Sequence, residues 1–427
     1  MEQHPETPPG ADRPGVRELL ARMAVDVGPL RESRPFRWLW LGQSVSYVGS
    51  QIVGVAVPYQ VYQLTGSTLA VGLISLVELV PLLTLTLIGG SLADAVDRRT
   101  MLLWTETGLL LTGIGFVVNA SLDEPYVWPL FVLGFLSAAF FCLGVGAMRS
   151  LTPHLVREEQ LPAASALNGI YSNFGAVAGP AAAGLLIAAI GLPLTYLVDV
   201  VSFAASLLSI WVLPRITPSP DADRPGLRSV LEGFRYLRGH KVVLGTFLVD
   251  SNAMVFGMPS ALFPAIGERL GGGAATVGYL YAAPYAGALV CSLLSGWTGH
   301  VRRQGLAVLV AAGMWGAAIA AFGLVDSLWP ALVLLAIAGG ADLISAVFRS
   351  TILLSATTES MRGRLAGIEF AQVASAPTLG NVEAGLVASL TSIRFSVVSG
   401  GVITVAGTIL IALVMPAVLT YDAKRKE

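Results

Sequence analysis

The sequence predicts an all-α polytopic membrane protein with twelve transmembrane helices in two six-helix pseudo-repeats. Three observations lead to this prediction: the composition, the apolar runs and the placement of positive charge. Hydrophobic residues make up 54% of the 427 residues, charged residues only 12%, and the mean hydropathy is +0.72. A soluble chain has about 25% charged residues, so the composition excludes a soluble globular protein. The formal net charge of −1 leaves no basic surface, so no nucleic-acid partner is expected.

Twelve apolar runs are each long enough to cross a bilayer, which takes about 20 residues. The runs span 38–63, 69–92, 101–120, 127–149, 163–190, 193–213, 242–266, 275–297, 304–325, 329–353, 364–389 and 394–419. Several exceed the minimum length, which allows the helices to tilt. Each run therefore predicts one transmembrane helix.

Lysine and arginine are concentrated on one side of these runs. Only Arg269 and Arg394 lie in the connections on the other side, and Arg149 and Arg349 lie near run ends. The remaining basic residues lie at the termini or in alternate connections. The positive-inside rule then predicts a multi-pass plasma-membrane protein with both termini in the cytoplasm.

The longest polar stretch between runs, residues 214–240, divides them six and six. After a proline-rich start, it has Leu227, Leu231, Phe234 and Leu237 at helical spacing with arginines between them, which predicts an amphipathic helix on the inner leaflet. The predicted organisation is a cytoplasmic tail at 1–36, a six-helix bundle at 37–213, the linker at 214–240, a second bundle at 241–420 and a tail at 421–427.

The two halves share short sequence features at a nearly constant interval. An Arg-Ser pair occurs at 149–150 and again at 349–350, 200 positions later. Asn-Gly-Ile at 168–170 matches Ala-Gly-Ile at 366–368, 198 positions later. Parallel six-helix repeats are typical of transporters whose site lies between the halves near mid-membrane. The sequence therefore predicts a transporter of a small-molecule substrate.

The loop after the second run resembles the signature loop of the major facilitator superfamily. It contains Gly90, Asp94, Asp97, Arg98 and Arg99. The resemblance implies a cytoplasmic latch, in which Asp94 faces a helix N-terminus flanked by Arg362 and Arg364. Ala95 and Asp97 replace the basic residue and the glycine of the pattern, so the latch is expected to use fewer charges. A positive-inside anchor with a helix cap is the alternative interpretation.

The fifth run resembles the antiporter motif of the same superfamily. The motif residues are Gly175, Gly179, Pro180, Ala183 and Gly184. The small residues at four-residue spacing share one helical face and permit close packing, and Pro180 favours a bend. The motif implies export, and general small-residue packing is the alternative.

Acidic residues within apolar runs are energetically unfavourable in the bilayer, so they are usually paired or functional. Asp342, Asp250 and Glu78 lie nearest the middle of their runs and are, in that order, the proton-coupling candidates. Asp342 and Arg349 are seven positions apart, so they share one helical face. Pairing between helices is the alternative role of each acid.

Other side chains are candidates for a central cavity or for charge pairing. The cavity candidates are Gln43, Tyr47, Gln60, Asn252, Met254, Met258, Glu369 and Gln372, because polar and flexible side chains suit bulky solutes. Simple packing is the alternative for each. Arg149, Arg349 and Glu106 are the predicted charge partners inside the membrane, with Glu106 expected to pair with Arg149.

The sequence gives no sign of nucleotide, metal or disulfide chemistry. The glycines at 271–273 lack the lysine of a phosphate-binding loop, and Cys142 and Cys291 have no metal-ligand spacing. No cofactor, no metal and no enzymatic activity are therefore expected.

Four stretches, 54–73, 89–99, 229–237 and 277–288, are similar to the drug and siderophore exporters of the superfamily. The similarity covers about residues 35 to 415. It implies export of a small amphipathic molecule, a siderophore or a drug, in exchange for protons, by a monomer with alternating access. The alternatives are a proton-coupled importer of a small metabolite and a non-transporting membrane sensor on the same scaffold.

Overall fold

The computed structural model describes residues 26–214, 232 and 235–422, and the side chains at 86–91, 93–95, 149 and 360 lie outside this description. All regular structure in these residues is helical, which confirms the predicted all-α class. The predicted amphipathic helix of the linker lies mostly outside the described residues, although 235–239 are helical.

The first group of helices contains α2 (Gly28–Glu32), α3 (Arg34–Thr65), α4 (Thr68–Ala95), α5 (Arg98–Ala120), α6 (Trp128–Leu155), the short 3-10 helix η1 (Glu158–Gln160) and α7 (Leu161–Trp211). Hydroxyl caps begin two of them. Ser33 accepts from the Phe36 N–H at 3.2 Å to start α3, and Ser67 accepts from the Ala70 N–H at 3.2 Å to start α4. Gly66, with φ of 61°, ends α3, so the two helices form a tight hairpin.

The chain reverses direction within α7 at Gly191, which has φ 78° and ψ 171°. Only glycine adopts this conformation without strain. Both arms lie against the start of α3: the Trp40 indole donates to the Leu167 carbonyl at 3.1 Å, and a Cβ on Gly42 would lie 2.6 Å from Ser209 Cβ. Residues 161–190 and 192–211 are therefore two antiparallel helices, in agreement with the two predicted runs.

The second group contains α9 (Lys241–Phe256), the 3-10 helix η2 (Ser260–Leu262), α10 (Phe263–Arg269), α11 (Gly273–Leu293), the 3-10 helix η3 (Ser295–His300), α12 (Gln304–Leu324), α13 (Leu328–Ala356), α14 (Glu359–Leu390), α15 (Ile393–Val414) and α16 (Pro416–Thr420). The helix bounds repeat those of the first group. Trp128 begins α6 and Leu328 begins α13, and Leu161 begins α7 while Glu359 begins α14. The interval of about 200 residues seen in the sequence thus recurs in the helices.

The predicted run at 242–266 is wrong as one continuous helix, because α9 ends at Phe256 and the chain resumes through η2 and α10. Pro259 has no N–H to donate to the preceding turn, which favours a break. The indole of Trp315 donates to the Gly257 carbonyl at 3.2 Å and so satisfies a carbonyl at the break. The interruption leaves irregular backbone at residues 257–259 between α9 and η2.

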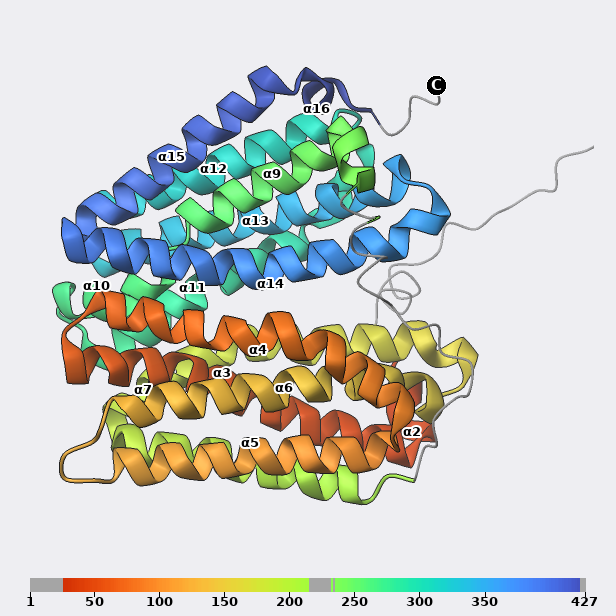
Figure 1. Cartoon of the computed structure of the whole chain (residues 1–427), viewed down its shortest axis with the longest axis vertical. Helices are drawn as coiled ribbons and strands as arrows, with labels where there is room; N and C mark the ends of the chain where they lie inside the picture. The colour runs from red at the N-terminus through yellow and green to blue at the C-terminus, as the bar shows by residue number, and fades with distance from the viewer. Residues whose placement is uncertain (1–25, 215–231, 233–234, 423–427) are drawn as a thin grey trace, which may run out of the picture.

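Nine helical segments among the described residues are long and apolar enough to span a membrane. One of them, residues 158–211, contains the reversal at Gly191 and so supplies two crossings. α3 and α14 are less apolar, but each has 32 residues and runs beside the others (Figure 1). The protein is therefore a multi-pass membrane protein whose helices are consistent with the predicted twelve crossings.

The two groups lie side by side, with α3–α7 in the lower part of Figure 1 and α9–α16 in the upper part. Clusters of buried apolar side chains fill each group, around Leu102 in the first and around Phe322 and Phe348 in the second, and the cluster around Phe116 also includes Ala261 and Ala274 of the second group. We call the end of the molecule that contains Arg98 and α2 the basic end. The end that contains Gly191 is called the opposite end.

Candidate functional site

The two groups meet along α4 with α14 and along α7 with α11. We call this contact the seam. The Thr68 hydroxyl of α4 donates to the Gly385 carbonyl of α14 at 3.1 Å, and the Gln63 amide of α3 donates to the Glu268 carboxylate of α10 at 2.7 Å. These residues lie toward the opposite end, beside the loops at 66–67 and 270–272. Among the described residues the seam is therefore closed at the opposite end.

The antiporter-motif residues lie at two different contacts of α7. A Cβ on Gly175 would lie 2.5 Å from the Tyr47 ring of α3, so this part of the motif lets α7 approach α3. A Cβ on Gly184 would lie 2.8 Å from the Gly278 Cα of α11, and one on Gly278 would lie 2.6 Å from the Pro180 carbonyl. The motif thus brings α7 into backbone contact with the second group at the seam.

The remaining motif residues fit the same arrangement. A Cβ on Gly179 would lie 3.1 Å from the Val48 carbonyl of α3. Ala183 is fully buried and belongs to an apolar cluster with Ile52 and Val277. Each of these positions therefore has room for little more than the side chain it has.

The signature-loop residues make contacts mainly within their own group. Asp97 caps α5 by accepting from the Arg99 N–H at 3.1 Å, and the Arg99 guanidinium donates to the Trp211 carbonyl at 2.6 Å. Arg98 is buried with one nitrogen 3.1 Å from His154. Gly90 and the Asp94 carboxylate belong to the undescribed side chains, so the predicted latch from Asp94 stays a prediction.

On the second group, the predicted latch residues lie at the N-terminal turn of α14. Arg364 donates to the Glu232 carboxylate of the linker at 2.5 Å, and Arg362 is exposed. The linker is thus attached to α14 at the basic end. The hydrophobic side chains of Leu237 and Leu365 pack in one cluster beside this ion pair.

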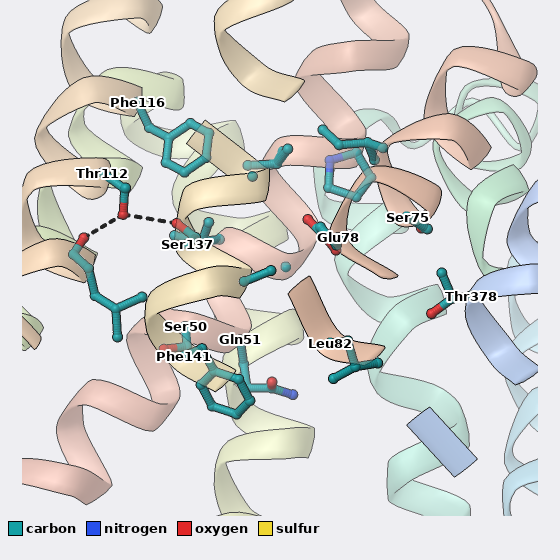
Figure 2. A pocket seen from close by; sticks show the side chains of 18 of the residues that line it. Ser50, Gln51, Ser75, Glu78, Leu82, Thr112, Phe116, Ser137, Phe141 and Thr378 are labelled. Carbon is teal, nitrogen blue, oxygen red and sulfur yellow. Dashed lines mark hydrogen bonds between the residues drawn. The ribbon is translucent and has the colours of Figure 1, made fainter. Parts of the chain in front are cut away.

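A cavity of about 470 Å³ opens at the seam beside the first group of helices. We call it the seam cavity. It is lined by α3, α4, α5, α6 and the second arm of α7, and on the other side by η2, α11 and α14 through Ser260, Tyr281, Thr378 and Asn381. Figure 2 shows Glu78 near the middle of this space, with Phe116 and Ser137 to one side and Thr378 to the other. The cavity is therefore shared by both groups.

Two acids line the seam cavity. Glu78 of α4 lies against Gly134 of α6, where a Cβ would be 3.4 Å from its Oε1 atom. Asp199 of α7 is only 2% exposed, and a Cβ on Gly113 of α5 would be 3.6 Å from its Oδ2 atom. A Cβ at either glycine would be in ordinary contact with the carboxylate. Hydroxyl groups lie near them, with the Ser137 hydroxyl donating to Thr112 at 2.9 Å.

A second set of charges, the Arg349 cluster, lies inside the second group and contains Asp250, Asp342, Arg349, Glu369 and Gln372. Arg349 of α13 forms an ion pair with Asp250 of α9, and Gln372 of α14 donates to the other Asp250 oxygen at 3.0 Å. Asp342 is 4.0 Å from the same guanidinium nitrogen. Asp250, Arg349 and Gln372 line a crevice of about 10 Å³, room for one water, which Glu369 also lines.

The Arg349 cluster unites several of the predicted residues. The predicted shared face of Asp342 and Arg349 agrees with their 4.0 Å contact, but the ion pair with Asp250 is the closer of the two. The Asp250 side chain is 4% exposed and the Asp342 side chain 39% exposed. One acid is thus fixed by the guanidinium, and the other lies where water reaches it.

The other predicted cavity residues have diverse surroundings. Gln43 donates to Glu106 at 3.0 Å and to Ser206 at 2.9 Å, and the Arg149 side chain expected beside Glu106 lies outside the description. Gln60 is buried and accepts from the Tyr196 hydroxyl at 2.8 Å, and Asn252 donates to the Thr404 carbonyl at 2.9 Å. These contacts join neighbouring helices.

Two predicted residues pack in the apolar core, and two others lie near a second cavity. Met254 is buried in the main cluster of the second group, and Met258 packs against it. Tyr47 packs edge-on against Tyr171, with ring centroids 5.9 Å apart. Tyr171 and Gln43 line a cavity of about 430 Å³ at the basic end, between α3, α6 and α7.

Sequence reasoning missed two residues of the seam cavity. Asp199 was visible as an acid inside an apolar run, but its run position gave no indication that it lines the same cavity as Glu78. Asn381 of α14 donates to the Ser75 hydroxyl of α4 at 3.3 Å and lines the cavity. An asparagine in an apolar helix was the available signal, because such a side chain needs hydrogen-bond partners.

Comparison with known proteins supports a transporter. A family model described as "Transmembrane secretion effector" matches residues 24–426. The enterobactin exporter EntS of Shigella boydii is 32% identical over 387 residues, covering 90% of this chain and 93% of that protein. EntS of Escherichia coli O139:H28 is 31% identical over the same length and coverage.

Solved structures share the fold. A bacterial homologue of the human lysosomal transporter Spinster, inward-facing and unoccupied, matches with a TM-score of 0.69 and 14% identity, covering 92% of this chain and 99% of that one. A bacterial homologue of the iron transporter ferroportin, in an inward-facing state, matches with a TM-score of 0.67 and 18% identity over the same coverage.

These matches span nearly the whole chain, and the proteins named are transporters and not enzymes. They agree with the membrane-spanning helices, the repeated bounds of the two groups and the signature-like loop. The chain therefore belongs to the transmembrane secretion effector family of the major facilitator superfamily.

Proposed function

We propose that this protein exports a small amphipathic molecule, siderophore or drug-like, in exchange for protons. The observation that supports exchange best is the composition of the Arg349 cluster, in which Asp250 and Asp342 contact one guanidinium and a third carboxylate, Glu369, lines the crevice beside it. The direction of transport is supported by the names of the family and of its relatives, which denote secretion and enterobactin export. The antiporter-motif residues at the seam agree with that direction.

The Arg349 cluster contains more acidic than basic side chains, which favours the binding of protons. With Asp250, Asp342 and Glu369 all ionised, the cluster would have two uncompensated negative charges in a region of low dielectric constant. Such charges are costly inside a membrane protein. The cluster therefore holds protons while it is shielded, and it releases them when water enters from the side with fewer protons.

We assign different roles to the acids of this cluster. Asp250 is held by Arg349 and Gln372, so it keeps the guanidinium in place. Asp342, at 4.0 Å and partly exposed, exchanges its proton with water. When Asp342 is ionised it competes with Asp250 for Arg349, which links protonation to the relative positions of α9 and α13. Glu78 is the third proton-coupling candidate.

Alternating access in this proposal is a rocking of two bundles, 37–213 and 241–420, about the seam. Both termini and the linker lie in the cytoplasm, so the state described here is closed toward the outside. The 430 Å³ cavity at the basic end is then open to solute from the cytoplasm. The protein acts as a monomer in the plasma membrane, and the predicted latch of Asp94 with Arg362 and Arg364 closes the basic end in the other state.

Everted membrane vesicles test the proposal directly. Their lumen corresponds to the outside of the cell, so an acidic lumen should drive uptake of enterobactin or of a cationic dye such as ethidium. A protonophore should stop the uptake. An importer would instead expel preloaded solute under the same gradient, and a sensor would bind solute without moving it. Either result would contradict the proposal.

A further inference from the structure

We propose that the seam cavity binds a cationic amphipathic solute, whose positive charge lies between Glu78 and Asp199. The inference rests on the proposed function as an exporter and specifies its substrate class. The site is distinct from the Arg349 cluster, because none of that cluster's five residues lines the seam cavity, although the cavity lining includes Glu78, the third proton-coupling candidate.

The charge of the cavity wall determines whether a positively or a negatively charged solute is favoured. Glu78 and Asp199 are the charged side chains among the described residues that line it, and lysine, arginine and histidine do not occur in that lining. Asp199 is 2% exposed, and its closest hydroxyl donor, Ser202, reaches only Oδ1 at 3.5 Å. A buried carboxylate without a cation is unfavourable. A bound solute with a positive charge supplies the counter-charge that the side chains of the wall do not provide.

The backbone around both acids leaves space for such an occupant. Gly134 lies beside Glu78 and Gly113 beside Asp199, where even an added Cβ would be in ordinary contact with the carboxylate, at 3.4 and 3.6 Å. Pro58 lies within α3 and lines the cavity, and Pro81 lies within α4 three positions after Glu78; a proline frees the carbonyl of the preceding turn. Carboxylates, hydroxyls and carbonyls are all acceptors, which suits a positively charged group.

The rest of the wall suits an apolar body attached to that charge. Phe116, Phe141, Phe203 and Tyr281 line the cavity together with aliphatic side chains. Aromatic faces attract cations as well as apolar groups. The volume of about 470 Å³ lies within the range of cavities that hold drug-sized molecules. The cavity therefore fits a lipophilic cation better than a small hydrated ion.

The position of the cavity connects binding to conformational change. Ser75 and Asn381, which bond across the seam, are both lining residues, so the solute contacts both groups when the opposite end is closed. Opening the seam there would separate the walls and expose the solute. A solute that is bound by contacts with both groups of helices is thus released when the two groups separate.

The test is equilibrium binding of tetraphenylphosphonium to the purified, full-length protein in nanodiscs. Neutral triphenylphosphine oxide serves as the probe without charge. We expect wild type to bind the cation at least about tenfold more tightly than the neutral probe. Glu78→Gln and Asp199→Asn should each weaken cation binding about tenfold and leave the neutral probe unaffected, because only the charge interaction is removed.

Two controls separate charge from folding. Glu383→Gln removes an acid from α14 that does not line the cavity, so its cation binding should match wild type. Glu78→Asp keeps the charge and should retain most of the affinity lost in Glu78→Gln. Wild-type cation binding in both Glu78→Gln and Asp199→Asn would overturn the inference. So would equal affinity of wild type for the two probes.

The outcomes also distinguish this inference from the proposed function. Proton-driven uptake of enterobactin with no charge-dependent binding of tetraphenylphosphonium would overturn the cation site and leave proton-driven export standing. Charge-dependent binding without any proton-driven uptake would support the cation site and contradict proton antiport.

Discussion

Asn381 of α14 donates a hydrogen bond to Ser75 of α4 at 3.3 Å, although the two residues are 306 positions apart. The carbonyl oxygen of the same amide accepts from the Ser260 hydroxyl at 2.6 Å and from the Ala261 N–H at 3.1 Å. One side chain thus joins α4, α14 and η2 where the two groups of helices meet. If the protein alternates between two states, this connection must break in the other state.

A disulfide in place of this hydrogen bond should trap the protein. We expect the double variant Ser75→Cys with Asn381→Cys to crosslink under mild oxidation, because side chains in contact are within reach of disulfide geometry. Vesicle uptake should stop on oxidation and return after reduction. Each single variant, which retains only Cys142 and Cys291 besides the new thiol, should be insensitive to oxidant. Full transport by the crosslinked protein would show that the seam does not open there.

Asp342→Asn should abolish uptake driven by a pH gradient while leaving the protein in the membrane. The amide keeps the shape but cannot exchange a proton with water, and the Asp342 side chain is more exposed than that of Asp250. Asp326→Asn is the matched control, because Asp326 is exposed in the loop just before the same helix. Gradient-driven uptake by Asp342→Asn at the wild-type rate would remove this residue from the coupling mechanism.

Arg349→Gln should destabilise the protein by about 3–5 kcal/mol, because it leaves the Asp250 carboxylate buried without its cation. The double variant Asp250→Asn with Arg349→Gln should be less destabilised than the sum of the single variants, since no unpaired charge remains. Thermal unfolding in detergent measures all four proteins. Strictly additive losses would mean that the ion pair contributes nothing specific.

Gly184→Ala should impair both stability and transport. The new Cβ would lie 2.5 Å from the Ala274 carbonyl and 2.8 Å from the Gly278 Cα, so α7 and α11 must separate. Overpacking of this kind typically costs about 1–3 kcal/mol. Gly313→Ala in α12, where a Cβ meets nothing within 4 Å, is the matched control and should behave as wild type. Thermal unfolding and vesicle uptake provide the comparison.

The ion pair between Asp326 and Arg394 should make a small, acid-sensitive contribution to stability. Hydrogen bonds from Arg394, at 2.7 Å to each oxygen, hold the pKa of Asp326 below its usual range. The folded protein then binds this proton less readily than the unfolded chain, so the contribution is present above about pH 4 and is lost as the pH falls through the lowered value.

Both partners of this pair are exposed, so salt should weaken the effect. Melting temperatures of wild type and Asp326→Asn, measured from neutral to acidic pH at low and high salt, provide the check. The difference between the two proteins should shrink at acidic pH and in high salt. A difference that is constant with pH would exclude a role for the Asp326 charge.

Much of the fold follows from local features of the sequence. The reversal at Gly191, between the predicted runs 163–190 and 193–213, and the roughly 200-residue interval depend on neighbouring residues or on repetition, so the sequence predicts them. The break in the seventh run was missed, because hydropathy alone does not reveal that Trp315, far along the chain, supports the interruption after Phe256.

The site was less accessible to sequence reasoning, because it depends on which faces of distant helices meet. Helical spacing put Asp342 and Arg349 on one face, but the choice of Asp250 as the closer partner is set by the packing of α9 against α13. The same limit applies to Glu78 and Asp199, which no spacing rule connects. A single sequence identifies the charged residues that are energetically unfavourable inside a membrane. Which of these residues contact one another depends on the packing of the folded chain.

The hairpin at Gly191 has a mechanical consequence. With one glycine as the connection, the adjoining ends of the two arms of α7 cannot separate. The first arm touches α11 through Gly184, and the second arm holds Asp199 in the wall of the seam cavity. We therefore expect a displacement of the first arm at the interface to pull on the second arm and to change the position of this carboxylate relative to a bound solute.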